Sequence, residues 1–189
     1  MSKKRAGAFA PAVSGIVIMD YNRKPNRLKG FDYSQGGAYF VTVCTKEKKK
    51  ILGRIVGGDA YIAPEIRLSE YGKTVEKYVL GIKGLHKYVI MPNHIHMIIF
   101  ISKDEGTMWA SSPTQSLPQL IKSFKILVTK ELGFSIWQRS FYDHIIRDDK
   151  DYEAIWEYID NNPLKWKEDR FYQNGRKTDD RQGFYAACH

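Results

Sequence analysis

The stretch "HKYVIMPNHIHMIIFI" (residues 86–101) decides the fold of this chain. It contains two apolar runs, 86–91 and 94–101, that are joined only by Pro92 and Asn93. A two-residue link between runs of this kind is typical of a β-hairpin, and Asn readily adopts the unusual dihedral angles of a tight turn. The sequence therefore predicts an antiparallel pair of strands at the centre of the chain.

Two histidines stand one residue apart in the second of these strands. Because side chains alternate along a strand, His94 and His96 face the same way, and Ile95, Met97 and Ile99 face the other. Two imidazoles on one rigid strand can reach one small ion and leave part of its coordination sphere open for a third ligand, water and a substrate oxygen. The alternative is a pair of buried structural histidines whose ring nitrogens are satisfied by hydrogen bonds.

The flanking sequence adds strands and helices in alternation. We expect a strand at 37–46, a helix that begins near Ser69, and helices at 116–133 and 148–162. This order favours an α+β domain with a single, mostly antiparallel sheet and helices packed on one face.

The helix at 148–162 carries a second pair of polar residues. Tyr158 lies beside its apolar stripe, and Asn162 follows four residues later on the same side. A Tyr hydroxyl can act as a covalent nucleophile, and an Asn oxygen is a suitable ligand for Mg²⁺ or Mn²⁺. Tyr142 is the rival nucleophile and His144 a rival ligand, but both fall in a segment expected to be extended.

Composition limits the functional classes. Lys and Arg number 30 against 21 Asp and Glu, a formal charge of +9 that suits a polyanion such as nucleic acid. The two cysteines, Cys44 and Cys188, offer no disulfide framework or metal spacing, which fits the reducing cytoplasm. We expect a cytoplasmic, nucleoid-associated protein without a membrane span, since no apolar run approaches the roughly 20 residues required.

Three stretches in the same order resemble a known family. "YVIMPNHIHMIIF", "IWQRSFYDHIIRD" and "DYEAIWEYIDNNPLKW" are similar to the single-tyrosine HUH transposases, and most closely to the REP-associated tyrosine transposases. The resemblance runs from about residue 21 to residue 166. It implies a ferredoxin-like antiparallel sheet with the histidines on a central strand.

The resemblance also implies an activity and its residues. His94, His96 and Asn162 would bind Mg²⁺ or Mn²⁺, although many relatives have the longer Gln in the place of Asn162. Tyr158 would attack a phosphate of single-stranded DNA near a hairpin and form a 5′-phosphotyrosine intermediate. The family includes dimers, in which the tyrosine helix serves the partner's histidines, and both a homodimer and a monomer are compatible with this chain.

Basic residues are candidates for the DNA contact. We expect Lys122, Lys125, Arg139 and Arg147 to bind the hairpin through its phosphates, and Trp109 or Tyr142 to stack on unpaired bases. For any single one of them, a solvated surface residue is the alternative.

The expected domain organisation has three parts: a flexible basic arm (1–20), the transposase domain (21–166) and a polar tail (167–189). Three alternatives to a transposase stay open. They are a protein that binds DNA hairpins without strand transfer, a replication-initiator or relaxase nickase, and a structural-zinc protein.

Overall fold

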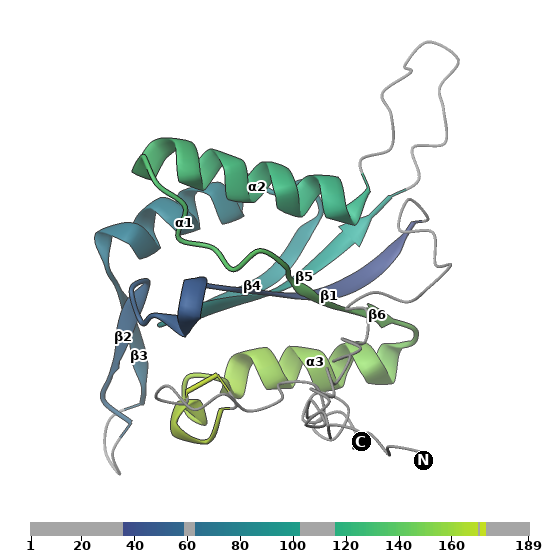
Figure 1. Cartoon of the computed structure of the whole chain (residues 1–189). Helices are drawn as coiled ribbons and strands as arrows, with labels where there is room; N and C mark the ends of the chain where they lie inside the picture. Colours follow the sequence, from purple (N-terminus) through teal and green to yellow (C-terminus); the bar gives the residue numbers. More distant parts are fainter. Residues whose placement is uncertain (1–35, 59–62, 103–115, 170, 173–189) are drawn as a thin grey trace, which may run out of the picture.

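A computed structural model describes residues 36–58, 63–102, 116–169 and 171–172, and all structural statements below concern these residues (Figure 1). The predicted arm at 1–20, Trp109 and most of the predicted tail lie outside them. The structure does not test the predicted domain boundaries, which stay predictions.

One four-stranded antiparallel sheet forms the centre of the protein, in the order β4-β5-β1-β6. Its strands are β1 (Gly37–Cys44), β4 (Leu85–Met91), β5 (His94–Ile101) and β6 (Tyr142–Ile146). Helix α1 (Glu70–Leu80) connects β1 to β4, and α2 (Leu117–Leu132) connects β5 to β6. This order and connectivity are those of a ferredoxin-like fold, so the predicted α+β class and antiparallel sheet are confirmed.

The central hairpin forms as predicted, but its turn uses Asn93 differently. Met91 pairs with His94, so Pro92 and Asn93 make the two-residue turn. The sequence suggested that Asn93 supplies an unusual dihedral angle, yet among the described non-glycine residues only Glu47 and Lys48 have positive φ. Asn93 is instead fully buried, and its amide group forms hydrogen bonds on both sides. Its side chain joins neighbouring segments by hydrogen bonds, and its backbone does not supply a positive φ to the turn.

Two helices cover one face of the sheet (Figure 1). Val75 and Val79 of α1 and Phe124 and Val128 of α2 pack with the buried β5 residues of that face. Ser69 caps α1 as expected, because its hydroxyl accepts a hydrogen bond from the Gly72 amide. Gly84 ends the turn after α1 with a φ of +80°, a conformation that favours glycine.

The third helix corrects one prediction. Helix α3 (Asp149–Asn161) lies on the opposite face of the sheet from α1 and α2 (Figure 1), so the helices do not all pack on one face. Ile155 and Ile159 of α3 pack against Phe40 and Ile98. The physical reason is that the strands are buried on both faces: the even-numbered residues of β5 that include the histidines need a cover of their own.

Smaller elements flank this core. Strands β2 (Gly53–Val56) and β3 (Glu65–Leu68) pair as a separate antiparallel ribbon, and short 3₁₀ turns η1 (Lys46–Lys48) and η2 (Trp166–Glu168) follow β1 and α3. No helix in the described part of the chain has the length and apolar character needed to cross a membrane.

Candidate metal centre and nucleophile

The turn before β5 fixes the ring of His94. The Asn93 amide nitrogen donates to the carbonyl of Lys48 at 3.1 Å and to that of Phe171 at 2.7 Å. This sets the orientation of the amide, so its oxygen, 2.8 Å from Nδ1 of His94, accepts a hydrogen bond from that nitrogen. A neutral His94 ring therefore carries its proton on Nδ1 and its lone pair on Nε2, as a metal ligand requires.

His96 is held by a partner that permits either tautomer. Its Nδ1 lies 2.8 Å from the Thr42 hydroxyl on the neighbouring strand β1, and a hydroxyl can donate or accept. Its Nε2 lies 3.0 Å from Nε2 of His94. Without an ion, His96 can donate its Nε2 proton to His94. With an ion, the proton can reside on Nδ1 and be donated to Thr42.

The spacing of the two Nε2 atoms fits a shared cation. Two imidazole nitrogens that bind one ion at about 2.1 Å with a near-right angle between them are about 3 Å apart. Both rings are fully buried, so their position is fixed by packing as well as by hydrogen bonds. The sequence prediction that both imidazoles face the same way is thus what the structure shows.

Tyr158 reaches the same place from α3. Its hydroxyl lies 3.4 Å from Nε2 of His96, and the two rings are 5.2 Å apart. Phe40 of β1 stacks on His96 and meets the edge of Tyr158, so one aromatic ring positions both groups. The tyrosine and the histidines that it meets come from the same chain.

Two oxygen donors follow Tyr158 in the sequence. Asn162 is only 3% exposed, and its side-chain oxygen is buried without a hydrogen-bond partner. An unsatisfied buried carbonyl oxygen is costly, and a cation would satisfy it. Asp169 forms a cluster with His94 and His96, in which one ligand atom from each residue lies within 4.8 Å of the others. Imidazole and oxygen donors together suit a divalent ion.

The segment after α3 folds back over the histidines. The Phe171 ring is fully buried at 4.5 Å from the ring of His94, and Trp166 lies 5.9 Å from that ring on η2. The Asp169 carboxylate accepts a hydrogen bond from the Phe171 amide at 2.5 Å, which holds the segment in a tight bend. These residues exclude water from one side of the imidazole pair.

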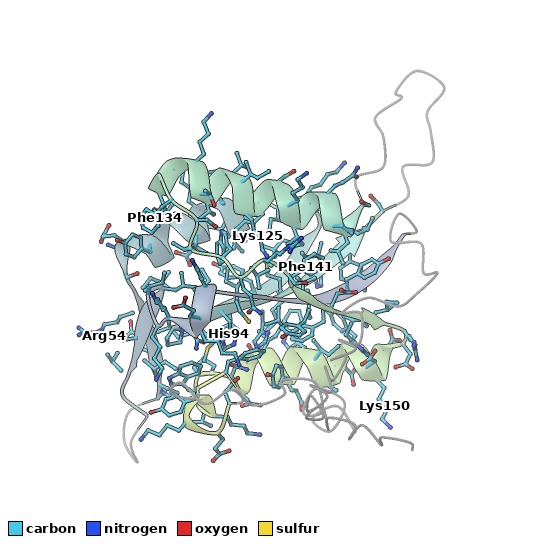
Figure 2. The ribbon with its side chains drawn as sticks, viewed as in Figure 1. Arg54, His94, Lys125, Phe134, Phe141 and Lys150 are labelled. Carbon is cyan, nitrogen blue, oxygen red and sulfur yellow. The ribbon has the colours of Figure 1, made fainter. Side chains whose placement is uncertain are left out.

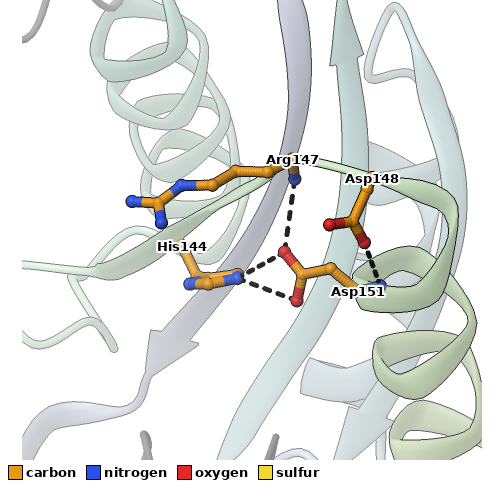
Figure 3. Close-up of polar contacts among 4 residues, drawn as sticks. All are labelled: His144, Arg147, Asp148 and Asp151. Carbon is orange, nitrogen blue, oxygen red and sulfur yellow. Dashed lines mark hydrogen bonds and ion pairs between the residues drawn. The ribbon is translucent and has the colours of Figure 1, made fainter.

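The start of α3 is tied to the end of β6 (Figure 3). Nε2 of His144 lies 2.8 and 3.1 Å from the two carboxylate oxygens of Asp151, and the Arg147 amide donates to the same carboxylate at 3.2 Å. Asp148 caps the helix by accepting from the Asp151 amide at 2.8 Å. These bonds set the position of α3, and therefore of Tyr158 two turns later. His144, the rival ligand, is engaged here and is not in the His94 cluster.

The predicted DNA-binding residues lie in two places. Lys122, Lys125 and Arg139 line one pocket of about 790 Å³ beside α2, on the far side of the sheet from His94 (Figure 2). Arg147 lies instead at the start of α3. Lys125 also bonds the protein's own backbone, because its ammonium group donates to the carbonyls of Gln138 and Ser140 at 2.9 Å each. Burial lowers the pKa of Lys125 to about 8.

Comparison with known proteins gives related sequences and related structures. No family model matches the chain. An uncharacterized protein of Haemophilus influenzae is 33% identical over 175 residues, which cover 80% of this chain and 94% of that protein. A second H. influenzae protein, named "Putative REP-associated tyrosine transposase", is 29% identical over 142 residues, 71% of this chain and 74% of that protein.

The fold also matches a REP-associated tyrosine transposase that was solved bound to a REP hairpin. The TM-score is 0.51 with 21% identity, over 70% of this chain and 69% of that one. The chain is similar to REP-associated tyrosine transposases in sequence and in fold. The family resemblance seen in the three sequence motifs is therefore confirmed, and this relation supports a transposase-family role.

One member of the candidate centre was missed by the sequence reasoning. Asp169 stands in "KWKEDR", where no spacing relates it to the histidines, and we expected this region to belong to a polar tail. Only the chain reversal after Pro163 brings it to the cluster. The nearest signal in the sequence is Pro163 itself, which indicates the end of the helix.

Proposed function

We propose that this protein is a metal-dependent transposase or endonuclease that cleaves and rejoins single-stranded DNA near hairpins through a 5′-phosphotyrosine intermediate. The observation that carries the proposal is the Tyr158 hydroxyl at 3.4 Å from His96, beside a cluster of two buried imidazoles and the half-buried Asp169 carboxylate. Similarity to a protein named as a REP-associated tyrosine transposase supports the same activity class.

His94, His96, Asp169 and Asn162 are the residues that would hold the ion. The buried, unpartnered oxygen of Asn162 and the Nε2 spacing of the histidines fit a divalent cation, and the oxygen donors favour Mg²⁺ or Mn²⁺. When bound, the ion would supply charge stabilisation to the scissile phosphate.

The chain's own residues account for the rest of the reaction. The Tyr158 hydroxyl loses its proton to water as its oxygen attacks the phosphorus and a Tyr–O–P bond forms. The bond from phosphorus to the 3′ oxygen breaks, and that oxygen takes up a proton from water and leaves as a 3′-hydroxyl. Phe40 and the bonds at the start of α3 hold the phenol in place. The phosphotyrosine conserves the bond energy, so a 3′-hydroxyl of another strand can reverse the step and rejoin DNA.

The residues of the site can assemble within one chain, and a homodimer that exchanges α3 between two copies stays an alternative. Tyr158 meets the histidines of its own chain, so no exchange of α3 with a second copy is required. The DNA partner we propose is a hairpin of the REP type, the ligand of the solved relative.

A denaturing gel tests the proposal directly. The protein is incubated with labelled single-stranded hairpin DNA from beside its own gene, with Mn²⁺ or with EDTA. We expect a covalent protein–DNA band only with Mn²⁺. It should disappear in Tyr158→Phe and His96→Ala and persist in Tyr142→Phe, the control for the rival nucleophile. Hairpin binding without any covalent band would favour the alternative, a binding protein without strand transfer.

A further inference from the structure

A second pocket lies directly beside the candidate metal centre. It has a volume of about 470 Å³ and is bounded by the β2–β3 ribbon on one side and by the segment 163–172 on the other. This volume is within the usual range of about 300–1,000 Å³ for small-molecule sites. It is a different pocket from the one beside α2.

Three connections place this pocket next to the histidines. Trp166 lines the pocket and also lies 5.9 Å from the ring of His94. Pro163 lines it directly after Asn162, and Pro92 lines it directly before Asn93. The pocket is therefore separated from the metal centre by little more than one indole ring.

The lining combines apolar and aromatic surface with positive charge. The apolar part comes from prolines, aliphatic residues and the rings of Trp166 and Tyr172. The ammonium group of Lys50 lies 4.1 Å from the centre of the Tyr172 ring, and Arg54 and Lys167 add two more exposed cations. None of the described lining residues is acidic, and Arg54 makes no ion pair with a described carboxylate. Figure 2 shows Arg54 at the β2–β3 ribbon, projecting outward.

This chemistry matches a nucleotide better than a purely apolar ligand. Bases stack on aromatic side chains regardless of sequence, and neighbouring lysines and arginines bind the backbone phosphates. An apolar compound would leave three cations unpaired, and an inorganic anion would not use the aromatic wall.

We propose that this pocket binds an unpaired nucleotide of the same DNA strand whose phosphate reaches the histidine pair. The base would lie in the corner formed by the rings of Trp166 and Tyr172, which stand at 88° to each other, and its phosphate would face Lys50 and Arg54. The inference rests on the proposed function for the identity of the ligand as DNA. It assigns the β2–β3 ribbon, which lies outside the ferredoxin-like core, a role in holding the strand.

The test uses the full chain and fluorescein-labelled single-stranded dT12, followed by fluorescence anisotropy. We expect Tyr172→Ala to weaken binding about tenfold. Arg54→Gln should weaken it about three- to tenfold and reduce the slope of log affinity against log salt by about 1. Arg67→Gln is the matched control, because Arg67 pairs with Arg54 across the same ribbon but does not line the pocket.

A photocrosslink provides a readout that does not depend on a substitution. With 5-iododeoxyuridine in the oligonucleotide, irradiation should attach DNA to Trp166 or Tyr172, which mass spectrometry of the digested protein would identify. Failure of dT12 to bind, equal effects of Arg54→Gln and Arg67→Gln, or crosslinks found only at α2 would each overturn the proposal.

The covalent-band assay separates this inference from the proposed function. A protein that forms the Mn²⁺-dependent band, but binds dT12 independently of Arg54 and Tyr172, retains the function and refutes the pocket. A protein that forms no band, but whose dT12 binding depends on both residues, retains the pocket and refutes the function.

Discussion

Replacing Asn93 tests whether the turn before β5 prepares His94 for metal binding. The side chain forms three hydrogen bonds, a part-buried one to Lys48 and buried ones to Phe171 and His94, and alanine removes all of them. At about 1 kcal/mol each, Asn93→Ala should lower the free energy of unfolding by about 3 kcal/mol. At about 2–4 °C per kcal/mol for a chain of this size, the melting temperature should fall by about 6–12 °C.

The same change should weaken metal binding for a separate reason. Asn93→Ala removes the oxygen that accepts the Nδ1 proton of His94, and loss of such an outer partner typically costs about 10–100-fold in metal affinity. The assays are thermal unfolding in EDTA by circular dichroism and titration with Mn²⁺ by isothermal titration calorimetry.

Asn93→Asp separates the two effects. Aspartate keeps an oxygen for the Nδ1 proton of His94 but loses the donors to the carbonyls of Lys48 and Phe171, so stability should fall while Mn²⁺ affinity stays near that of the parent. Asn161→Ala, an exposed change at the end of α3, is the control. Equal Mn²⁺ affinity in Asn93→Ala and Asn93→Asp would refute the argument that this amide fixes the tautomer.

Two further predictions concern α3 and α2. Asp151→Asn removes the carboxylate that contacts His144, so it should lower the free energy of urea unfolding by about 1–2 kcal/mol and reduce the yield of the covalent band. Asp149→Asn, an exposed change in the same turn, should do neither. Equal effects of the two changes would refute the role of the contact between Asp151 and His144. Burial lowers the pKa of Lys125 from 10.5 to about 8 in the folded protein. Between these pH values the unfolded chain binds more protons than the folded one, so the contribution of Lys125 to the free energy of unfolding should rise as pH rises from about 8 to 10.5. The free energy of unfolding in urea should rise less across this pH range in Lys125→Met than in the parent. Parallel curves of this free energy against pH for the two proteins would contradict the lowered pKa.

Local periodicity was sufficient to predict the parts of the site that depend on one element. Strand alternation places His94 and His96 on one face, and the helical repeat places Tyr158 and Asn162 on one side of α3. The two-residue link at Pro92 predicted the hairpin that carries the histidines. These features depend on neighbours within a few residues, which the sequence displays directly.

The remaining features depend on contacts between distant segments. Asp169 and Phe171 reach the histidines only because the chain reverses after α3, and Lys125 is engaged because the segment after α2 passes its ammonium group. The placement of α3 on the second face likewise follows from the burial of both faces of the sheet. An apolar stripe predicts that a helix face is covered, but it does not indicate which surface covers it.

The unequal packing of the two faces has a consequence for hydrogen exchange. Strand β5 is paired on both sides and lies over a large core shared with α1 and α2, whereas α3 has only Ile155 and Ile159 fully buried. Amide protons of β5 should therefore exchange only on global unfolding, and those of α3 through a smaller opening of lower free energy. Such an opening would carry Tyr158 away from the histidines while the imidazole pair stays assembled, so the nucleophile can be withdrawn without unfolding the sheet.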